Sequence, residues 1–424
     1  MPGGFETRRY DLPPPPGGFD TRPYGSPPPP APTIFPMALA LTVRRRASPD
    51  RYLGWVIGAR AAFGGVVVFS AVSYLAETKA GGDELRLLGL HVVRLALAFG
   101  LMLGVSRLDY RKIARVARPA LIGLWVLLAV TPLVGVVSGG AARWLRVGAF
   151  GFQPSELARV ALLVYLAVLL ARKQPIIGDG RRAAVPLFVW ILGTCGLIGM
   201  QNLSAALVLL VTSLVVCFIG RVRVLHLASL VPVGAVLALL MLLFSPARAA
   251  RVESFLGVKL FAATTEQQVF DRQDEGYQAH QAAIAFARGG IVGQGPGKSV
   301  QRDFLPAPFN DFIFAIIGEE YGLVGTFAVL GLFAALLFRG YLRVARHAPD
   351  PLGLFLATGV TTALALYGFI HAGVASGLLP VTGLPLPFVS YGGSSLVASG
   401  LMAGLLLSVS RHCGGDSAPA EATR

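Results

Sequence analysis

Charged residues are scarce in this sequence. Only 14% of the 424 residues are Asp, Glu, Lys or Arg, whereas 54% are hydrophobic. Because a typical soluble domain carries about 25% charged residues, this composition excludes an ordinary water-soluble protein. It favours a polytopic membrane protein instead.

Cysteine is also rare, with three residues in the chain. Cys195 and Cys217 fall in apolar segments and Cys413 lies near the end, without metal-type spacing. This excludes a disulfide framework and indicates no cysteine metal site. The net charge of +15 could indicate nucleic acid, but the cations lie in short clusters between apolar segments. We therefore expect no nucleic-acid partner.

Residues 1–50 lack any long apolar run. They contain a tandem repeat, GGFETRRYDLPPPP followed by GGFDTRPYGSPPPP, and so few apolar residues predict a disordered, Pro-rich cytoplasmic tail. The tail is either a docking segment for a cytoplasmic partner or a dispensable extension, with Met37 as an alternative start. We favour the second interpretation, because such tails usually carry no fold.

The rest of the chain contains apolar stretches long enough to span a bilayer. Ten are predicted, at 53–75, 87–105, 117–137, 154–171, 185–200, 203–219, 224–244, 311–338, 352–371 and 396–410. Only QNLS separates the fifth from the sixth, which indicates a tight turn or a broken helix there. The predicted fold is therefore all-α and polytopic, with about ten transmembrane helices.

Basic residues recur in alternate loops and fix the predicted orientation. By the positive-inside rule these loops, the N-terminal tail and the C-terminal tail at 412–424 are cytoplasmic. The longest external loop is then 245–310, in which acidic and basic residues nearly cancel. The cytoplasmic clusters begin with Arg44, Arg45, Arg46 and Arg51, and continue with Arg107, Arg111, Lys112, Arg115, Arg118, Arg172, Lys173, Arg181, Arg182, Arg221, Arg223, Arg339, Arg343 and Arg346.

The segment from Gly276 to Gly325 is the polar exception in this apolar chain. Asp311 stands at the edge of a hydrophobic run that itself contains Glu319 and Glu320. An ionisable residue at a membrane boundary usually marks a substrate, ion or proton site. We therefore predict the working site here, with a neutral solvated loop as the alternative.

The string GGIVGQGPGKS within this segment only loosely resembles a nucleotide-binding loop. It lacks the preceding strand and the spacing, so we reject nucleotide binding. Flexible backbone N–H groups and cations at a membrane surface suit the pyrophosphate of a lipid carrier instead. The substrate-binding candidates are Gln278, Lys298, Ser299 and Arg302 here and Arg143 in the loop before the fourth span.

Two further stretches are predicted to line a polar cavity. Glu156 and Arg159 are three residues apart on a helix and can pair, either as a structural ion pair or as a cavity wall. The string LLPVTGLPLPFVSYGGSS holds too much Pro and Gly for a regular helix, which predicts a re-entrant or surface loop buried against protein. It contributes Ser390, Gly392 and Gly393.

Taken together, these strings resemble a known family. QPSEL, GYQ followed by GPGKS, NDFIFAIIGEE and LPFVSYGGSS stand in the order found in the SEDS proteins, the family of FtsW and RodA. The similarity covers nearly all of residues 50–411 and is greater to the division branch, FtsW, than to the elongation branch, RodA. Departures are Arg159, where lysine is usual, Asn202 and Ser204 within a usual QPDLG-like string, and His371, where asparagine is usual.

The resemblance implies a peptidoglycan glycosyltransferase in the bacterial cytoplasmic membrane that polymerises lipid II. It implies a class B penicillin-binding protein as partner, besides other membrane proteins of the divisome or elongasome. The family's essential carboxylate falls on Asp311, expected to accept a proton from the acceptor sugar's 4-hydroxyl. Cationic side chains, or a divalent cation such as Mg²⁺ or Mn²⁺, would offset charge on the leaving pyrophosphate.

Two hypotheses of other classes remain. A lipid II flippase would also use charges inside the membrane, but it predicts a midplane site, and the hydropathy shows no obvious inverted repeat. A scaffold that only holds a partner would not explain why Asp311, Glu319 and Glu320 stand in or beside an apolar span.

Overall fold

The computed structural model describes residues 49–79, 84–138, 141–147, 150–243, 249, 252–253, 255–256, 275–305 and 308–413. All of them belong to one compact unit, Arg44–Arg424. The predicted N-terminal tail, most of the C-terminal tail and the first half of the predicted long external loop lie outside the described residues.

The unit is built almost entirely of helices, as predicted. They are α1 (Arg51–Lys79), α2 (Glu84–Arg107), α3 (Tyr110–Val134), α4 (Pro154–Lys173), α5 (Val185–Gln201), α6 (Leu203–Ile219), α7 (Val224–Leu243), α9 (Glu275–Gly289), α10 (Ile313–Arg339), α11 (Pro351–Ala375) and α12 (Gly393–Ser410). Single helical turns are η1 (Gln174–Ile176), η2 (Gly180–Ala184), η4 (Gln301–Asp303) and η5 (Gly340–Ala345).

Ten of these helices account for the ten predicted spans. In the part of the chain that is described, nine helices are long and apolar enough to cross a membrane, and α6 is a shorter apolar helix. The predicted break between the fifth and sixth spans falls at Asn202, whose backbone is extended and whose side chain caps α6 by accepting from the Ala205 N–H. The prediction of a polytopic helical membrane protein is confirmed.

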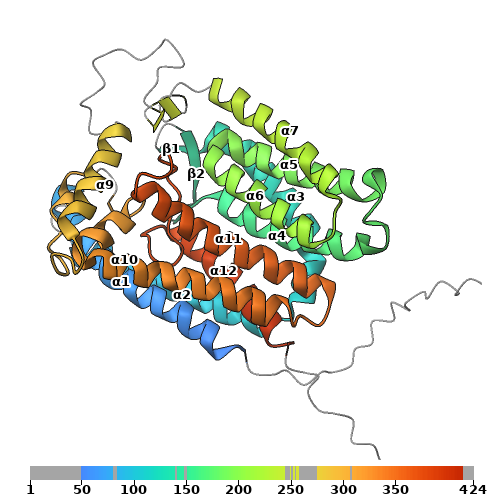
Figure 1. Ribbon diagram of the computed structural model, residues 1–424, viewed down its shortest axis with the longest axis horizontal. Coiled ribbons are helices and arrows are strands. Elements are labelled where there is room, and N and C mark those ends of the chain that lie inside the picture. Colours follow the sequence, from blue (N-terminus) through green and yellow to red (C-terminus); the bar gives the residue numbers. More distant parts are fainter. Residues whose placement is uncertain are drawn as a thin grey trace, which may run out of the picture. The chain divides into compact units, whose positions relative to one another are not determined.

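Close helix packing at the centre depends on small residues. A Cβ on Gly400 would lie 2.4 Å from the Ala98 carbonyl oxygen, and one on Gly404 would lie 2.7 Å from that of Met102. Such glycines let helices approach closely where lipid supplies no hydrophobic driving force. Helices α2 and α12 therefore lie side by side, α11 packs against α12, and α10 packs against α11 (Figure 1).

One end of the bundle, which we call the cation-rich end, is joined by ion pairs. Arg339 donates to Asp50 at 2.9 Å, and Arg111 donates to Asp350 at 2.5 Å. Ser408 accepts from the Tyr110 N–H at 3.1 Å. These contacts bring the starts of α1, α3 and α11 and the ends of α10 and α12 together, as the alternating basic loops predict.

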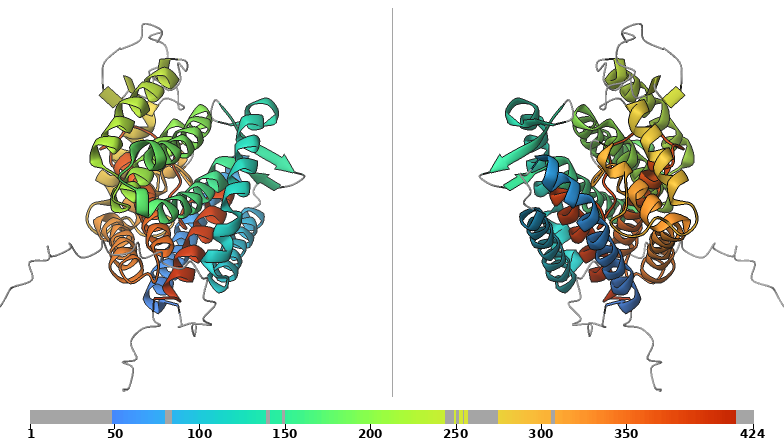
Figure 2. Two further views of the ribbon diagram at one scale, coloured as in Figure 1. Left: turned by 90° about the vertical axis from the view of Figure 1, so that its right-hand side faces the viewer. Right: turned by 90° about the vertical axis from the view of Figure 1, so that its left-hand side faces the viewer.

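One predicted helix boundary is wrong, and one small sheet was not predicted. Helix α3 begins at Tyr110, not at residue 117, because Asp109 caps its first turn and the four basic residues Arg111, Lys112, Arg115 and Arg118 continue the helix. The predicted all-α fold also missed a three-stranded antiparallel sheet, β1 (Val136–Ser138), β2 (Ala141–Val147) and β3 (Phe150–Phe152), in order β1-β2-β3. Figure 2 shows this sheet beside the end of α3.

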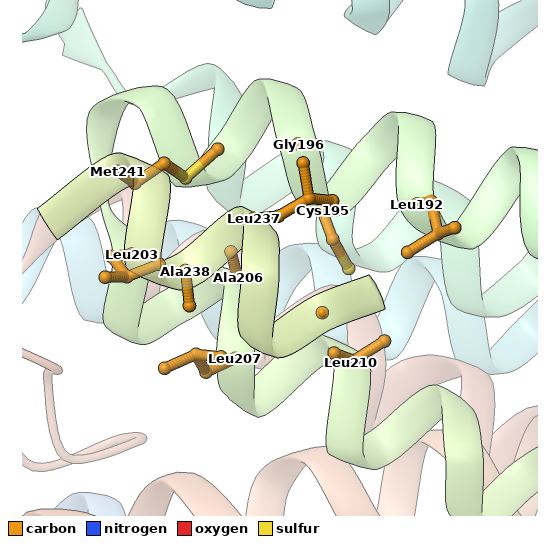
Figure 3. A pocket seen from close by; sticks show the side chains of 11 residues that line it. Leu192, Cys195, Gly196, Leu203, Ala206, Leu207, Leu210, Leu237, Ala238 and Met241 are labelled. Atoms are coloured by element: carbon orange, nitrogen blue, oxygen red, sulfur yellow. The ribbon is translucent and has the colours of Figure 1, made fainter. Parts of the chain in front are cut away.

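An apolar pocket lies between α5, α6 and α7 (Figure 3). Its lining includes Cys195, Leu210, Leu237 and Met241. These side chains offer no acid, base or cation, so this pocket is not where the polar chemistry lies.

Candidate active site

Asp311 lies in the turn immediately before α10 and is partly exposed. The residues that follow it, Ile313–Ile317, are buried, so the carboxylate stands at the edge of an apolar helix. Its Oδ2 lies 3.7 Å from the place that a Cβ on Gly383 would occupy, and Gly383 has a φ of +63°. Glycine suits the positive φ at that position, and the Gly383 backbone lies next to the Asp311 carboxylate.

The loop between α11 and α12 holds the Asp311 turn in place. The Ser390 hydroxyl donates to the Asn310 carbonyl at 2.9 Å and accepts from the Leu386 N–H at 2.8 Å. The Tyr391 N–H donates to the Phe309 carbonyl at 3.0 Å. Ser390 is fully buried, so its hydrogen bonds fix the backbone one residue before the carboxylate.

A buried arginine that we did not predict supports the same loop. Arg60, in α1, is 1% exposed, donates to the Pro387 carbonyl at 3.1 Å and stacks on the Phe333 ring at 3.8 Å. Phe388 follows with a φ of +65°, which is uncommon for a residue with a side chain. A cation inside the first apolar span was the signal that sequence reasoning passed over.

Helix α10 is broken at Gly322, whose φ of 63° and ψ of −160° are not helical. The glycine-rich loop fills the break. The N–H groups of Leu323 and Val324 donate to the carbonyls of Gly290 and Ile291 at 3.0 and 3.1 Å. Hydrogen bonds from the loop thus satisfy backbone groups that a break inside an apolar span would leave unpaired.

Glu319, just before the break, binds the glycine-rich loop. Its carboxylate accepts from the Ser299 hydroxyl at 2.6 Å and from the Gln301 N–H at 3.0 Å, and it pairs with Arg288 at 3.2 Å. The Glu319 side chain is fully buried. A buried carboxylate with this many donors stabilises its surroundings, so Glu319 and Ser299 serve to hold the loop.

Glu320 faces α1 instead. It accepts from the Ser70 hydroxyl, and the Ser70 carbonyl accepts from Arg302 Nη1 at 3.1 Å. Arg302 also lies 3.5 Å from the Asp303 carboxylate. These contacts dock the loop that carries Arg302 on α1. The phosphate-binding role predicted for Arg302 stays a prediction.

The remaining candidates lie on separate elements. Lys298 is exposed on the glycine-rich loop, Gln278 is half-buried in α9, and Arg143 is half-buried in β2. Gly392 and Gly393 form the N-cap and the first residue of α12. The structure thus brings together a loop-holding group around Glu319 and a second group around Asp311 and Ser390, and none of the contacts described above joins Lys298, Gln278 or Arg143 to either group.

Glu156 and Arg159 form a buried pair in α4, with Nη2 2.6 Å from Oε2. The guanidinium also lies 3.9 Å over the Tyr367 ring. In the described residues, Nε and Nη1 of Arg159 have no hydrogen-bond partner. The predicted pairing is thus present, and both alternatives, a structural ion pair and a cavity wall, stay predictions.

Among the residues that the structure describes, no three His, Cys, Asp or Glu side chains are grouped closely enough to hold a metal ion.

The comparisons with known proteins all point to one family. The model of the cell cycle protein family FtsW/RodA/SpoVE matches residues 51–414. The probable peptidoglycan glycosyltransferase FtsW of Geobacter sulfurreducens is 34% identical over 383 residues, which cover 89% of this chain and 100% of that protein. Stage V sporulation protein E of Bacillus subtilis is 34% identical, covering 87% and 98%.

Solved structures agree with the sequences. The rod shape determining protein RodA of Thermus thermophilus is 29% identical, with a TM-score of 0.61, covering 87% of this chain and 98% of that chain. A chain in a structure described as "Structural coordination of polymerization and crosslinking by a peptidoglycan synthase complex" is 28% identical, with a TM-score of 0.67, covering 87% and 99%.

Proposed function

The chain belongs to the FtsW/RodA/SpoVE family of cell cycle proteins and is a peptidoglycan glycosyltransferase, and from that premise we propose that it polymerises lipid II with Asp311 as the general base. The observation that carries the proposal is the setting of Asp311. A partly exposed carboxylate stands at the edge of an apolar helix, and Ser390 holds the backbone of its turn.

The proposed reaction needs one proton acceptor. The 4-hydroxyl of the acceptor sugar attacks the anomeric carbon of the lipid-linked donor, the Asp311 carboxylate accepts the hydroxyl proton, and undecaprenyl pyrophosphate leaves. An α-linked donor and a β-linked product require a single displacement with inversion. No second nucleophilic carboxylate is then needed, which fits the structural task of Glu319.

We further propose that the Asp311 end of the bundle faces outward. It lies opposite the cation-rich end, which the positive-inside rule places in the cytoplasm together with both chain termini. The loop 376–392 is then re-entrant from outside, and 245–310 is the large external loop within the core at 51–411. Lys298 and Arg143 would meet the substrate's phosphates from this side.

The partner we propose is a class B penicillin-binding protein that cross-links the strands. Support comes from the similar chain solved in a peptidoglycan synthase complex described as coordinating polymerization and crosslinking. We assign the chain to septal synthesis in cell division, because its relatives include several named FtsW. RodA-like sidewall synthesis is the alternative. Depletion of the protein from cells distinguishes the two roles, because filamentous cells would support septal synthesis and round cells would contradict it.

The test is polymer formation by the purified protein with its partner and labelled lipid II. We expect Asp311→Ala to fold and bind the partner but to make no strands on a gel. Asp303→Asn is the matched control, since Asp303 is an exposed carboxylate on the same loop, and it should polymerise as the parent does. Polymer from Asp311→Ala at the parental rate would refute the assignment of the base.

A flippase remains the second candidate, favoured by the break in α10 beside two buried glutamates. Broken helices commonly form transporter sites. Here, however, loop carbonyls occupy the break. Reconstituted protein that moves labelled lipid II across vesicles, with or without Asp311, would favour transport.

A further inference from the structure

The first turn of α12, like those of α4, α5 and α10, has no side-chain cap. Asp109 caps α3, Asn202 caps α6 and Asp350 caps α11 through side-chain oxygens. Helix α12 begins at Gly393 after Gly392, which has no side chain to accept a hydrogen bond. The first N–H groups of a helix carry partial positive charge and need an acceptor.

A full positive charge lies at the same place. Arg94, in α2, has its Nε 3.3 Å from the position of a Cβ on Gly393, and its guanidinium lies 5.0 Å over the Tyr391 ring. Within the described ranges, no carboxylate forms an ion pair with Arg94. A cation beside a helix N-terminus is unfavourable by itself. An anion between the two would relieve the repulsion.

His91 is a second, independent feature of this place. It is 1% exposed, and within the described part of the chain neither ring nitrogen has a hydrogen-bond partner. Its ring stacks on Tyr391 at 5.3 Å. His91 lies about one helical turn before Arg94, toward the N-terminus of α2. Because α2 and α12 run side by side in the same direction, the first N–H groups of α12 point toward that end of α2. A buried imidazole without partners is costly unless something binds it.

We propose that the α12 N-terminus, Arg94 and His91 together bind the diphosphate of a prenyl lipid. The site adjoins the Asp311 turn, because the Tyr391 ring packs edge-on against Phe309 at 5.8 Å and its N–H donates to the Phe309 carbonyl. The inference rests on the proposed function, in which a prenyl diphosphate is the leaving group. Positive groups fixed beside it stabilise the charge that develops as it leaves.

The test is direct binding of farnesyl diphosphate to the purified full-length chain in detergent, by isothermal titration. We expect Arg94→Gln to raise the Kd at least tenfold, His91→Gln to raise it severalfold, and Arg94→Lys to fall between the parent and Arg94→Gln. Arg86→Gln removes an exposed cation from the same helix and should leave the Kd unchanged. An equal Kd for Arg94→Gln and the parent overturns the proposal, as does an equal loss in Arg86→Gln.

Competition identifies which part of the ligand is recognised. Inorganic pyrophosphate should displace farnesyl diphosphate from the parent but not from Arg94→Gln, whereas farnesol should displace it from neither. Displacement by farnesol alone would overturn the proposal, because it would show that the prenyl chain is what binds. Arg94→Lys keeps the test decisive if Arg94→Gln does not fold.

The outcome can be separated from that of the proposed function. Asp311→Ala should bind farnesyl diphosphate with the parental Kd while making no polymer. If Asp311→Ala polymerises normally, the assigned base is wrong, but the Arg94 dependence of the Kd still decides whether this anion site exists.

Discussion

The two ends of the helical bundle differ in how many of their buried polar groups have partners, although Nε of Arg411, at the cation-rich end, also lacks one among the described residues. At the cation-rich end, Asp50 and Asp350 each have an arginine partner within 3 Å. At the Asp311 end, several buried side chains keep polar atoms without hydrogen-bond partners in the described residues. They are Arg60, His91, Asn310, Glu320 and His371.

This difference locates the site on physical grounds. Unpaired buried polar groups are few in native proteins and are expensive to maintain. A cluster of unpaired buried polar groups is best explained by a ligand that binds them or a mechanism that uses them. Groups whose hydrogen bonds are all satisfied stabilise the fold instead. Glu319 is the informative exception, because it lies toward the Asp311 end and yet has every partner it needs.

The two adjacent glutamates of α10 give the sharpest test of the difference between fully paired and unpaired buried groups. We expect Glu319→Gln to lower the free energy of unfolding by about 3 kcal/mol, since an amide cannot accept from all the donors that surround Glu319. Glu320→Gln should cost about 1 kcal/mol or less, because its Oε2 has no hydrogen-bond partner to lose within the described residues. Denaturant unfolding in detergent measures both, and equal losses would contradict the distinction.

The break in α10 gives the next largest expected loss of stability. A Cβ on Gly322 would lie 2.4 Å from the Ile291 carbonyl oxygen and would require a positive φ. We expect Gly322→Ala to destabilise the protein by about 2 to 3 kcal/mol. Gly331→Ala lies in the same helix with nothing within 4 Å, so it should be neutral or slightly stabilising. A neutral Gly322→Ala would show that the loop does not depend on this break.

Ser390 tests the link from the loop to Asp311. Ser390→Ala leaves the Asn310 carbonyl and the Leu386 N–H without their partner and should cost about 1 to 2 kcal/mol of stability. Because the turn then holds Asp311 less firmly, polymerisation should fall about tenfold at unchanged lipid II KM. Ser376→Ala, an exposed serine of the same loop, is the control. A matching drop in both variants would mean that Ser390 has no special role.

The sequence predicted the apolar spans, the interruption at QNLS and the buried loop before α12, because each depends on local composition. It could not predict that Arg302 docks on Ser70 or that the glycine-rich loop fills a break beside Gly322. Those contacts join residues more than 200 and about 30 positions apart. The strands at 136–152 were missed because they are short and lie between two strong apolar signals. Arg60, His91 and Arg94 were passed over as single polar residues inside spans.

The smallest effect is expected at the cation-rich end. Arg339 is about one-third exposed and pairs with Asp50, which also accepts from the Leu53 N–H at 3.2 Å. Arg339→Gln leaves the Asp50 carboxylate, whose side chain is 7% exposed, with that second donor. We therefore expect a loss of about 1 kcal/mol and an unchanged polymerisation rate. Thermal unfolding and the lipid II assay together check this. A loss of activity in Arg339→Gln without a loss of stability would show that the cation-rich end also takes part in the reaction, and the contrast between the two ends would fail.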